Sequence, residues 1–238
     1  MPYFLTSEEL AEQKEFELSG EEARHILLSH RVRSGEQVKV QDPLGNRFMC
    51  EVLKAGKRAL NLKTLQRLKT PEEPGVRITL FQSAVSEKAL EFILQKSTEL
   101  GAQEVVLFNS SRTALRLMPE KFNAKLSRYE KIVWEAAKQC ERVRPPKLTF
   151  IASESEMQAA LKALETVLLL DPHGKAFEPH TGQNARSIGI VVGPEGGFTE
   201  VEVQKFATLP NSKVLSLGPI LLRAETAALA ALSLVRFG

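Results

Sequence analysis

Short apolar runs alternate along most of the chain with longer segments in which apolar residues recur at helical spacing. Continuous apolar runs are typical of parallel strands that are buried on both faces of a sheet. Helical spacing is typical of an amphipathic helix with one buried face. The predicted strands are 76–81, 105–108, 148–151, 167–170, 188–192 and 214–217. The predicted helices are 87–100, a long helix that begins at Pro119 and carries Cys140 on its apolar face, two helices opened by Ser153 and Thr199, and 223–235.

Two of the predicted helices begin with a capping-box pattern. Ser153 is followed in the next turn by Glu156, and Thr199 is followed in the same way by Glu202. In a capping box the hydroxyl and the carboxylate each accept a hydrogen bond from the other residue's backbone amide, so free amides of the first turn are satisfied. These helix starts support the predicted helices between the strands. The alternation of strands and helices predicts an α/β domain with a parallel sheet.

The first part of the chain follows a different rhythm. A helix-like segment at 21–30 precedes strand candidates that are short and separated by turn signals, which predicts a small β-barrel. The strand candidates are 38–40, 48–53 and 60–65. Two prolines and a glycine then lie within Thr70–Gly75, as in a linker between domains. The predicted organisation is a small domain at 1–70, a linker at 71–75 and an α/β domain at 76–238.

Composition and charge add a class of partner. Of the 238 residues, 43% are hydrophobic and 26% are charged, which is ordinary for a globular protein. No apolar run reaches the ~20 residues that span a bilayer, and the N-terminus lacks a secretory pattern. Two distant cysteines predict free thiols in a reducing cytoplasm. Residues 47–69 carry seven Lys or Arg against one acid, and residues 112–147 carry ten against four, which indicates either a polyanionic partner or solvated faces.

Three of the predicted strands end in unusual sequence. These ends are Leu170–Gly174, Gly193–Phe198 and Leu217–Thr226. Ligands of parallel sheets bind outside the carboxyl ends of the strands. The glycines of Gly193–Phe198 let a ligand approach the backbone closely, so this segment indicates either a ligand-binding loop or a tight turn. It is neither a Walker loop nor the dinucleotide-binding glycine fingerprint.

The glycine-rich segment belongs to a longer pattern. The sequence GPEGGF at 193–198, with LG at 217–218 and LLRAETA at 221–227, resembles the ribosomal small-subunit methyltransferase E family. Further matches, which extend the resemblance over nearly the whole chain, are His25–Leu27, Arg31–Arg33, Lys88, Glu91, Lys96, Glu99–Gly101, Arg112, Gln139 and Arg142. The chain departs from the family pattern at Pro219, where a basic residue is usual, at Ala224, where Thr is usual, and at Cys140–Glu141, where Ser-Gly is usual.

The resemblance implies an α/β fold of the SPOUT class, in which the C-terminal segment of the parallel sheet forms a trefoil knot, a rare exception to unknotted chains. It implies an N-terminal PUA-like RNA-binding β-barrel. The implied reaction is methylation of N3 of a specific uridine in 16S ribosomal RNA of the small subunit, where N3 takes the methyl group of S-adenosylmethionine and S-adenosylhomocysteine leaves. The implied enzyme is a cytoplasmic homodimer with its site at the subunit interface and without a metal.

The resemblance also implies roles for individual residues. Arg223 is the first candidate for stabilising the uracil anion, and Arg112 is the second. Glu195 or Glu225 is the candidate base for the N3 proton. The candidates for binding the cofactor through their backbone are Leu170, Gly193, Glu195, Gly196, Leu217 and Leu222. The candidates for contacts with RNA phosphates are Arg24, Arg31, Arg33, Arg47, Arg112, Arg116, Arg142 and Arg144.

Other interpretations stay open on the sequence alone. Cys140 could be a nucleophile for methylation at uracil C5, but its place on the apolar face of a helix favours a core thiol. The four histidines do not have metal-ligand spacing. The protein could also be a knotted methyltransferase of another RNA, such as a tRNA ribose, or a non-catalytic RNA-binding protein.

Overall fold

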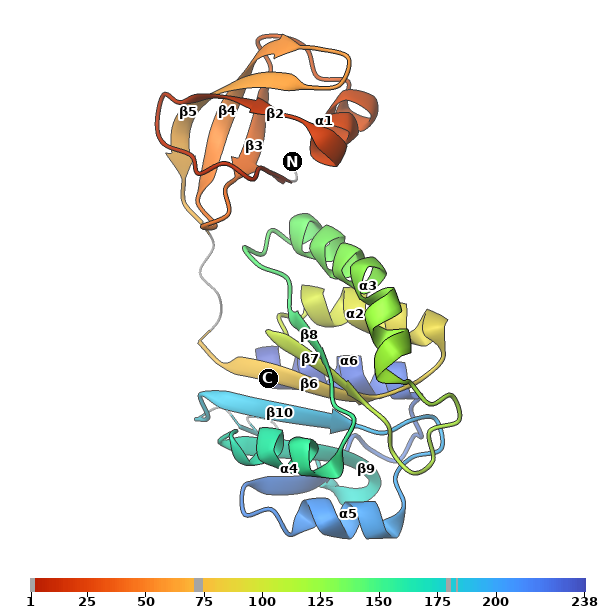
Figure 1. The fold of residues 1–238 in the computed structure, drawn as a ribbon. Coiled ribbons are helices and arrows are strands. Elements are labelled where there is room, and N and C mark those ends of the chain that lie inside the picture. The colour runs from red at the N-terminus through yellow and green to blue at the C-terminus, as the bar shows by residue number, and fades with distance from the viewer. Residues whose placement is uncertain (1–2, 71–74, 179–180, 183) are drawn as a thin grey trace. The chain divides into compact units, whose positions relative to one another are not determined.

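The computed structural model describes the whole chain except residues 1–2, 71–74, 179–180 and 183, and it contains two compact units (Figure 1). The first unit is Met1–Glu72 with Lys138–Arg144, and the second is Glu73–Ala137 with Pro145–Gly238. The linker predicted at 71–75 lies, apart from Gly75, outside the described residues. The domain boundaries inferred from the sequence therefore stay a prediction, and the contacts group 138–144 with the N-terminal residues.

The first unit is a curled five-stranded mixed sheet with the strand order β1-β3-β4-β5-β2 (Figure 1). Its elements are β1 (Tyr3–Leu5), β2 (Glu15–Leu18), α1 (Gly20–His25), the π-helical turn η1 (Ile26–His30), β3 (Gln37–Gln41), β4 (Arg47–Ala55) and β5 (Leu60–Leu68). β1 and β3 are parallel, and the other neighbours are antiparallel. Alternate side chains of each long strand are buried in one core, as in a sheet with one apolar face.

The sequence predicted β3, β4 and β5 but not the two edge strands. β1 and β2 are very short, and β2 exposes Glu15 and Glu17 while it buries Phe16 and Leu18. Such a short alternation is a weak signal because many loops contain one by chance. The helix predicted at 21–30 is present, but its second half is η1 rather than α-helix.

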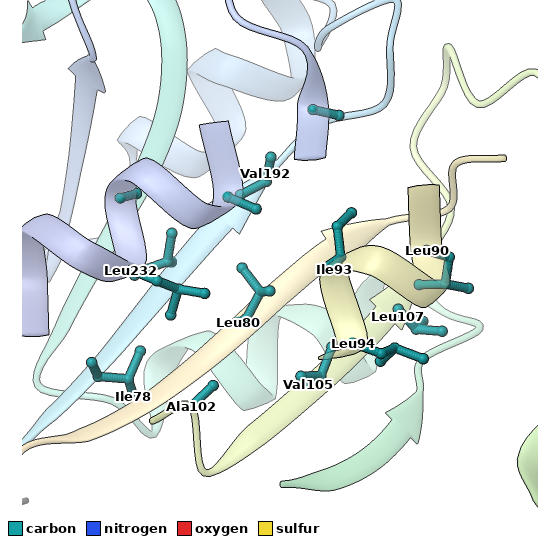
Figure 2. Close-up of a cluster of buried hydrophobic side chains, with 14 of the residues drawn as sticks. Ile78, Leu80, Leu90, Ile93, Leu94, Ala102, Val105, Leu107, Val192 and Leu232 are labelled. Atoms are coloured by element: carbon teal, nitrogen blue, oxygen red, sulfur yellow. The ribbon is translucent and has the colours of Figure 1, made fainter. Parts of the chain in front are cut away.

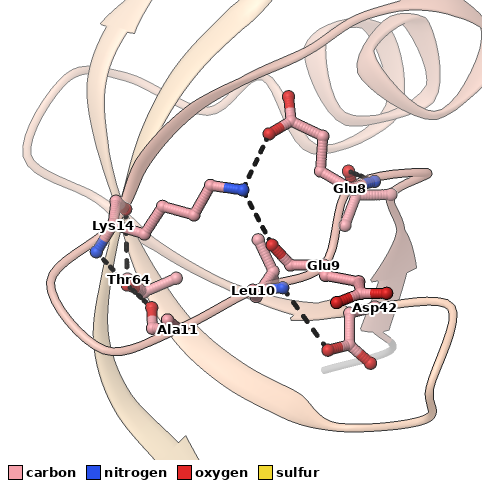
Figure 3. A network of polar contacts seen from close by, with 8 residues as sticks. Glu8, Glu9, Leu10, Ala11, Lys14, Asp42 and Thr64 are labelled. Atoms are coloured by element: carbon pink, nitrogen blue, oxygen red, sulfur yellow. Dashed lines mark hydrogen bonds and ion pairs between the residues drawn. The ribbon is translucent and has the colours of Figure 1, made fainter.

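The loop between β1 and β2 is held to the sheet by a network of polar contacts (Figure 3). The backbone amide of Lys14 donates to the Thr64 hydroxyl at 2.8 Å, and the Lys14 ammonium forms an ion pair with Glu8 at 3.0 Å. The Leu10 amide donates to the buried Asp42 carboxylate at 3.4 Å. These contacts give the loop's backbone the partners that a sheet would otherwise supply.

Arg47 joins the segment 138–144 to the first unit. Arg47 is 3% exposed, and its guanidinium donates to the carbonyls of Glu141 and Arg142 at 2.9 and 2.8 Å. It also lies 3.9 Å above the ring centroid of Tyr3. Burial raises the pKa of Tyr3 to about 12, so its phenol stays protonated and donates to the Arg142 carbonyl. Gln41 completes the attachment through a hydrogen bond to the Val143 carbonyl at 2.9 Å.

The second unit is a six-stranded parallel sheet with the strand order β11-β9-β10-β6-β7-β8. Its strands are β6 (Arg77–Ser83), β7 (Glu104–Phe108), β8 (Lys147–Phe150), β9 (Thr166–Ala176), β10 (Ser187–Val192) and β11 (Ser212–Ser216). Its helices are α2 (Glu87–Glu99), α3 (Pro119–Gln139), α4 (Glu154–Lys162), α5 (Glu200–Ala207) and α6 (Ala224–Phe237). The all-parallel sheet confirms the predicted α/β class, whereas the trefoil knot stays a prediction.

Helices cover both faces of this sheet. Side chains of α2, α3 and α6 pack with Ile78, Leu80 and other residues of one face, and Figure 2 shows this cluster with Ile93, Val192 and Leu232. Side chains of α4 and α5 pack on the opposite face. This burial on both faces explains why the strands are continuous apolar runs in the sequence. Among the described residues, none of the helices is long and apolar enough to cross a membrane.

β9 is longer than its predicted range of 167–170. The strand is continuous from Thr166 to Ala176, but its pairing with β11 stops after Leu169 and resumes with a shift of register, where Lys175 pairs with Leu215. Gly174 lies where the pairing shifts, and a Cβ atom there would come within 2.7 Å of the Leu215 backbone. The strand can therefore approach its neighbour only because residue 174 has no side chain.

Candidate functional site

The three unusual strand ends meet around one cavity of about 630 Å³ in the second unit. The cavity lies at the carboxyl ends of β9, β10 and β11 and is lined from Leu170–His173, from Gly193–Phe198 without Gly196, and from Leu215–Ala224, with Ser86 and Ala89 from the start of α2. Segments far apart in the sequence are thus brought to one edge of the sheet, which is where ligands of parallel sheets bind.

The glycine-rich segment after β10 presents its backbone to the cavity. Gly197 has a φ of +68°, Gly218 has a φ of +119°, and a Cβ atom at either position would meet no other atom within 4 Å. Both glycines line the cavity, so their amide and carbonyl groups can approach a ligand closely. The Gly197 amide donates to the Pro194 carbonyl at 2.9 Å, which closes the turn.

Five of the six backbone positions predicted to bind a cofactor line this cavity, namely Leu170, Gly193, Glu195, Leu217 and Leu222. Gly196 does not line it. Its carbonyl accepts a hydrogen bond from Arg112 Nη1 at 3.1 Å, and a Cβ atom at Gly196 would lie 3.3 Å from Arg112 Cβ. Gly196 therefore faces the loop that follows β7 and keeps that loop close to the cavity.

The start of α6 carries two of the candidate reactive groups. Arg223 occupies the N-cap position, Glu225 lies in the first turn, and both line the cavity. Within the described residues the structure records no ion pair or hydrogen bond for either side chain, so Arg223 is not held by Glu225. The Glu195 carboxylate accepts a hydrogen bond from the Ser86 amide at 3.4 Å, which ties the glycine-rich segment to the start of α2.

Arg112 lies in a loop that is anchored at both of its ends. The buried hydroxyls of Ser83, Ser110 and Thr113 lie 3.0 to 3.2 Å from one another at the ends of β6 and β7. On the other side, the Ser111 amide donates to Glu202 Oε1 at 2.7 Å. These bonds hold the backbone on either side of Arg112, while the Arg112 side chain itself is exposed.

Glu202 was expected only to cap α5, and the structure gives it a second contact. Its carboxylate accepts hydrogen bonds from the Thr199 amide and hydroxyl at 2.8 and 2.9 Å, which confirms the capping box, and also from Ser111. Burial alone would raise the pKa of Glu202, but the hydrogen bonds from Thr199 and Ser111 outweigh it and hold the pKa below its usual value. Sequence spacing cannot reveal the Ser111 contact because the two residues are distant along the chain.

The sequence is similar to those of known RNA methyltransferases. Residues 71–236 match the family described as RNA methyltransferase domain, and residues 18–65 match the RNA methyltransferase PUA domain. The ribosomal RNA small subunit methyltransferase E of Bacillus subtilis is 29% identical over 98% of this chain and 94% of its own length. The enzyme of the same name from Neisseria gonorrhoeae is 30% identical over 98% of this chain and 95% of its own, with a TM-score of 0.84.

The chain belongs to the ribosomal RNA small subunit methyltransferase E family. The Neisseria gonorrhoeae structure contains S-adenosylmethionine. A methyltransferase from Legionella pneumophila, also solved with this cofactor, is 25% identical over 98% of this chain and 96% of its own, with a TM-score of 0.85. The resemblance drawn from the GPEGGF and LLRAETA segments is thereby confirmed.

The arginines predicted to contact RNA in this member of the methyltransferase E family differ in exposure. Six of them are exposed, namely Arg24, Arg31, Arg33, Arg112, Arg116 and Arg144. Arg142 is half-buried. Arg47 is buried, and its donors are used by Gln41, Glu141 and Arg142. In this structure Arg47 therefore stabilises the first unit and does not present its guanidinium to a phosphate.

The cysteine and histidine candidates lie in different parts of the two units. Cys140 is half-buried and does not line the cavity. His173 lines the cavity, whereas His25 and His30 pack edge-on against Phe4 in the first unit. His180 lies outside the described residues. Across the residues that the structure describes, His, Cys, Asp and Glu side chains do not gather into a group that could hold a metal ion.

Proposed function

We propose that this protein transfers a methyl group from S-adenosylmethionine to N3 of a uridine in 16S ribosomal RNA of the small subunit. The observation that carries the proposal is the convergence of the GPEGGF, LG and LLRAETA segments on one cavity. Relatives in the same family carry the name ribosomal RNA small subunit methyltransferase E, and one was solved with S-adenosylmethionine.

The cavity has the properties that S-adenosylmethionine requires. Its volume of about 630 Å³ lies within the ~300–1,000 Å³ of small-molecule sites. Open backbone at Gly197 and Gly218 supplies hydrogen-bonding groups for a flat polar base, and apolar side chains such as Leu170 and Leu222 supply packing surface. We assign cofactor binding to Leu170, Gly193, Glu195, Leu217 and Leu222, with Gly196 acting through its contact with Arg112.

When it is bound, the cofactor supplies a methyl group on an activated sulfonium, so the protein has to orient the RNA base and stabilise charge. Loss of the N3 proton leaves an anion on the uracil that is shared with the neighbouring carbonyl oxygens. The Arg223 guanidinium lines the cavity without a protein partner among the described residues, so it is available to stabilise that anion. Arg112 is the second group for this role.

Two carboxylates line the same cavity and are candidates for accepting the N3 proton. Glu195 accepts a weak hydrogen bond of 3.4 Å from the Ser86 amide, and Glu225 has no recorded hydrogen bond within the described residues. The Ser86 contact holds the Glu195 side chain to the loop, whereas the Glu225 side chain is able to turn toward a bound base. On this ground we favour Glu225 as the base and assign Glu195 to holding the loop.

The remaining assignments concern partners. We assign RNA phosphate contacts to Arg24, Arg31, Arg33, Arg142 and Arg144 in the first unit and to Arg112 and Arg116 in the second. We also propose a cytoplasmic homodimer. Ile220 and Leu221 line the cavity and are 76% and 81% exposed, which is unusual for large apolar side chains and is consistent with a partner subunit at the cavity mouth.

The deciding experiment is transfer of a tritiated methyl group to small ribosomal subunits from cells that lack this gene, followed by nucleoside mass spectrometry. We expect the label in 3-methyluridine. Methyl transfer to purified tRNA with none to small subunits would replace the proposed substrate, and failure to bind S-adenosylmethionine in calorimetry would favour a non-catalytic RNA-binding protein.

A further inference from the structure

A second cavity, of about 250 Å³, lies at the carboxyl ends of β7 and β8. It shares none of its lining residues with the larger cavity. One part of its lining is apolar and comes from the end of β7, from α4 and α5, and from the turn after α5, whereas the rest is polar or charged. The apolar part includes Phe108, Met157, Leu161, Phe206 and Leu209. The family assignment does not explain this cavity, since the proposed cofactor site is complete without it.

A pair of aromatic rings connects the walls of the two cavities. Phe198 lines the larger cavity, and its ring stacks on Phe108 with a centroid distance of 6.5 Å and an interplanar angle of 6°. Phe198 also meets Phe206 edge-on at 5.6 Å. Because Phe108 and Phe206 line the second cavity, the two cavities are neighbours at the same edge of the sheet.

The charged residue of the second cavity that has no recorded partner among the described residues is an arginine. Two acids line it, but Glu202 accepts hydrogen bonds from Ser111 and Thr199, and Glu154 forms an ion pair with Lys205 at 2.9 Å. Arg116 lines the cavity with an exposed side chain, and the structure records no partner for it among the described residues. A pocket with an apolar side, beside a guanidinium that has no recorded partner among the described residues, suits a ligand with a flat base and an attached phosphate.

We propose that this second cavity binds a nucleobase of the substrate RNA next to the target nucleotide, and that Arg116 contacts its phosphate. The proposal rests on the proposed function, because the target must be unpaired to present N3 and its neighbours are then free to turn outward. The aromatic and aliphatic wall packs against the face of the base. Gln158 lines the cavity and offers an amide that can both donate to and accept from the base edge.

The test fills the second cavity without touching the first. Gln158 and Ala159 are consecutive exposed residues of α4, but only Gln158 lines the cavity. Gln158→Trp therefore fills the pocket, and Ala159→Trp is a matched control that adds the same bulk outside it. We expect Gln158→Trp to raise the KM and the dissociation constant for small ribosomal subunits by about tenfold, the scale of one lost base contact. The affinity for S-adenosylmethionine and the melting temperature should stay at wild-type values.

Direct binding to subunits separates this proposal from the proposed function. If the wild-type protein binds subunits but methylates no RNA, the proposed function fails, and the comparison of subunit affinities still tests the cavity. Equal subunit affinity of Gln158→Trp and the wild type would overturn the cavity proposal. Equal weakening by Gln158→Trp and Ala159→Trp would overturn it as well, because the effect would then come from the surface of α4.

Discussion

Glu202 links the cap of α5 to the Arg112 loop, and Glu202→Gln tests whether this link positions Arg112. The two carboxylate oxygens have separate tasks, since Oε1 accepts from Ser111 and Oε2 accepts from Thr199. A glutamine of the same shape has one oxygen and one amino group, and the amino group cannot accept a hydrogen bond. Whichever way the glutamine amide turns, its amino group faces the donor group of either Ser111 or Thr199, and that hydrogen bond is lost.

The size of the effect follows from these contacts. A hydrogen bond to a charged group contributes about 1.5–3 kcal/mol, and a helix cap contributes about 1 kcal/mol. Glu202 is partly exposed, so solvent reduces these values, and we expect the free energy of unfolding to fall by about 2 kcal/mol. Loss of the Ser111 contact frees the Arg112 loop, and we expect kcat to fall on the order of tenfold or more, as for other small displacements of a positioned group.

The chain contains a matched control in Glu156, which forms the same capping box on α4. Its carboxylate accepts from Ala152 and Ser153 at 3.3 and 3.4 Å, and no contact to a distant loop is recorded for it among the described residues. Glu156→Gln should lower stability slightly and leave kcat unchanged. Urea denaturation and steady-state methylation of both variants, with S-adenosylmethionine affinity from calorimetry, measure the two effects separately.

Two results would refute this reasoning. A wild-type kcat in Glu202→Gln would mean that the Ser111 contact does not position Arg112, and an equal loss of kcat in Glu156→Gln would mean that kcat follows stability alone.

The pH dependence of stability gives a further check. Because the pKa of Glu202 is lowered in the folded protein, its stabilisation is fully present above the unfolded value of about 4.3 and is lost as the pH falls through the folded value. The stability difference between wild type and Glu202→Gln should therefore shrink only below about pH 4.

Three further substitutions test the remaining assignments. Arg223→Ala should lower methyl transfer by about 100-fold or more with unchanged calorimetric affinity for S-adenosylmethionine, and full activity would remove Arg223 from the mechanism. Gly174→Ala should lower the free energy of unfolding by about 1–3 kcal/mol, because its Cβ would collide with the Leu215 backbone; a wild-type urea midpoint would contradict this. Arg47→Ala should cost about 3 kcal/mol in the same assay through lost hydrogen bonds, and the exposed Arg58→Ala serves as its control.

Local patterns in the sequence determined the elements of the α/β unit. Ser153 with Glu156 and Thr199 with Glu202 predicted helix starts that the structure confirms as capping boxes, because a capping box needs only residues within one turn. The buried strands were readable for a similar reason, since burial on both faces makes them continuously apolar. The GPEGGF and LLRAETA segments indicated the family, because their composition is specific along the chain itself.

Contacts between distant segments were decided only by the tertiary structure. Arg47 and Arg144 lie in equally basic surroundings in the sequence, but Arg47 is buried against the carbonyls of Glu141 and Arg142 whereas Arg144 is exposed. Glu202 likewise has the local pattern of a cap, and its bond to Ser111 exists because the ends of β7 and β10 lie at one edge of the sheet. The sequence determined which residues carry charge and which form helices, and packing determined which of those charges remain free to meet a ligand.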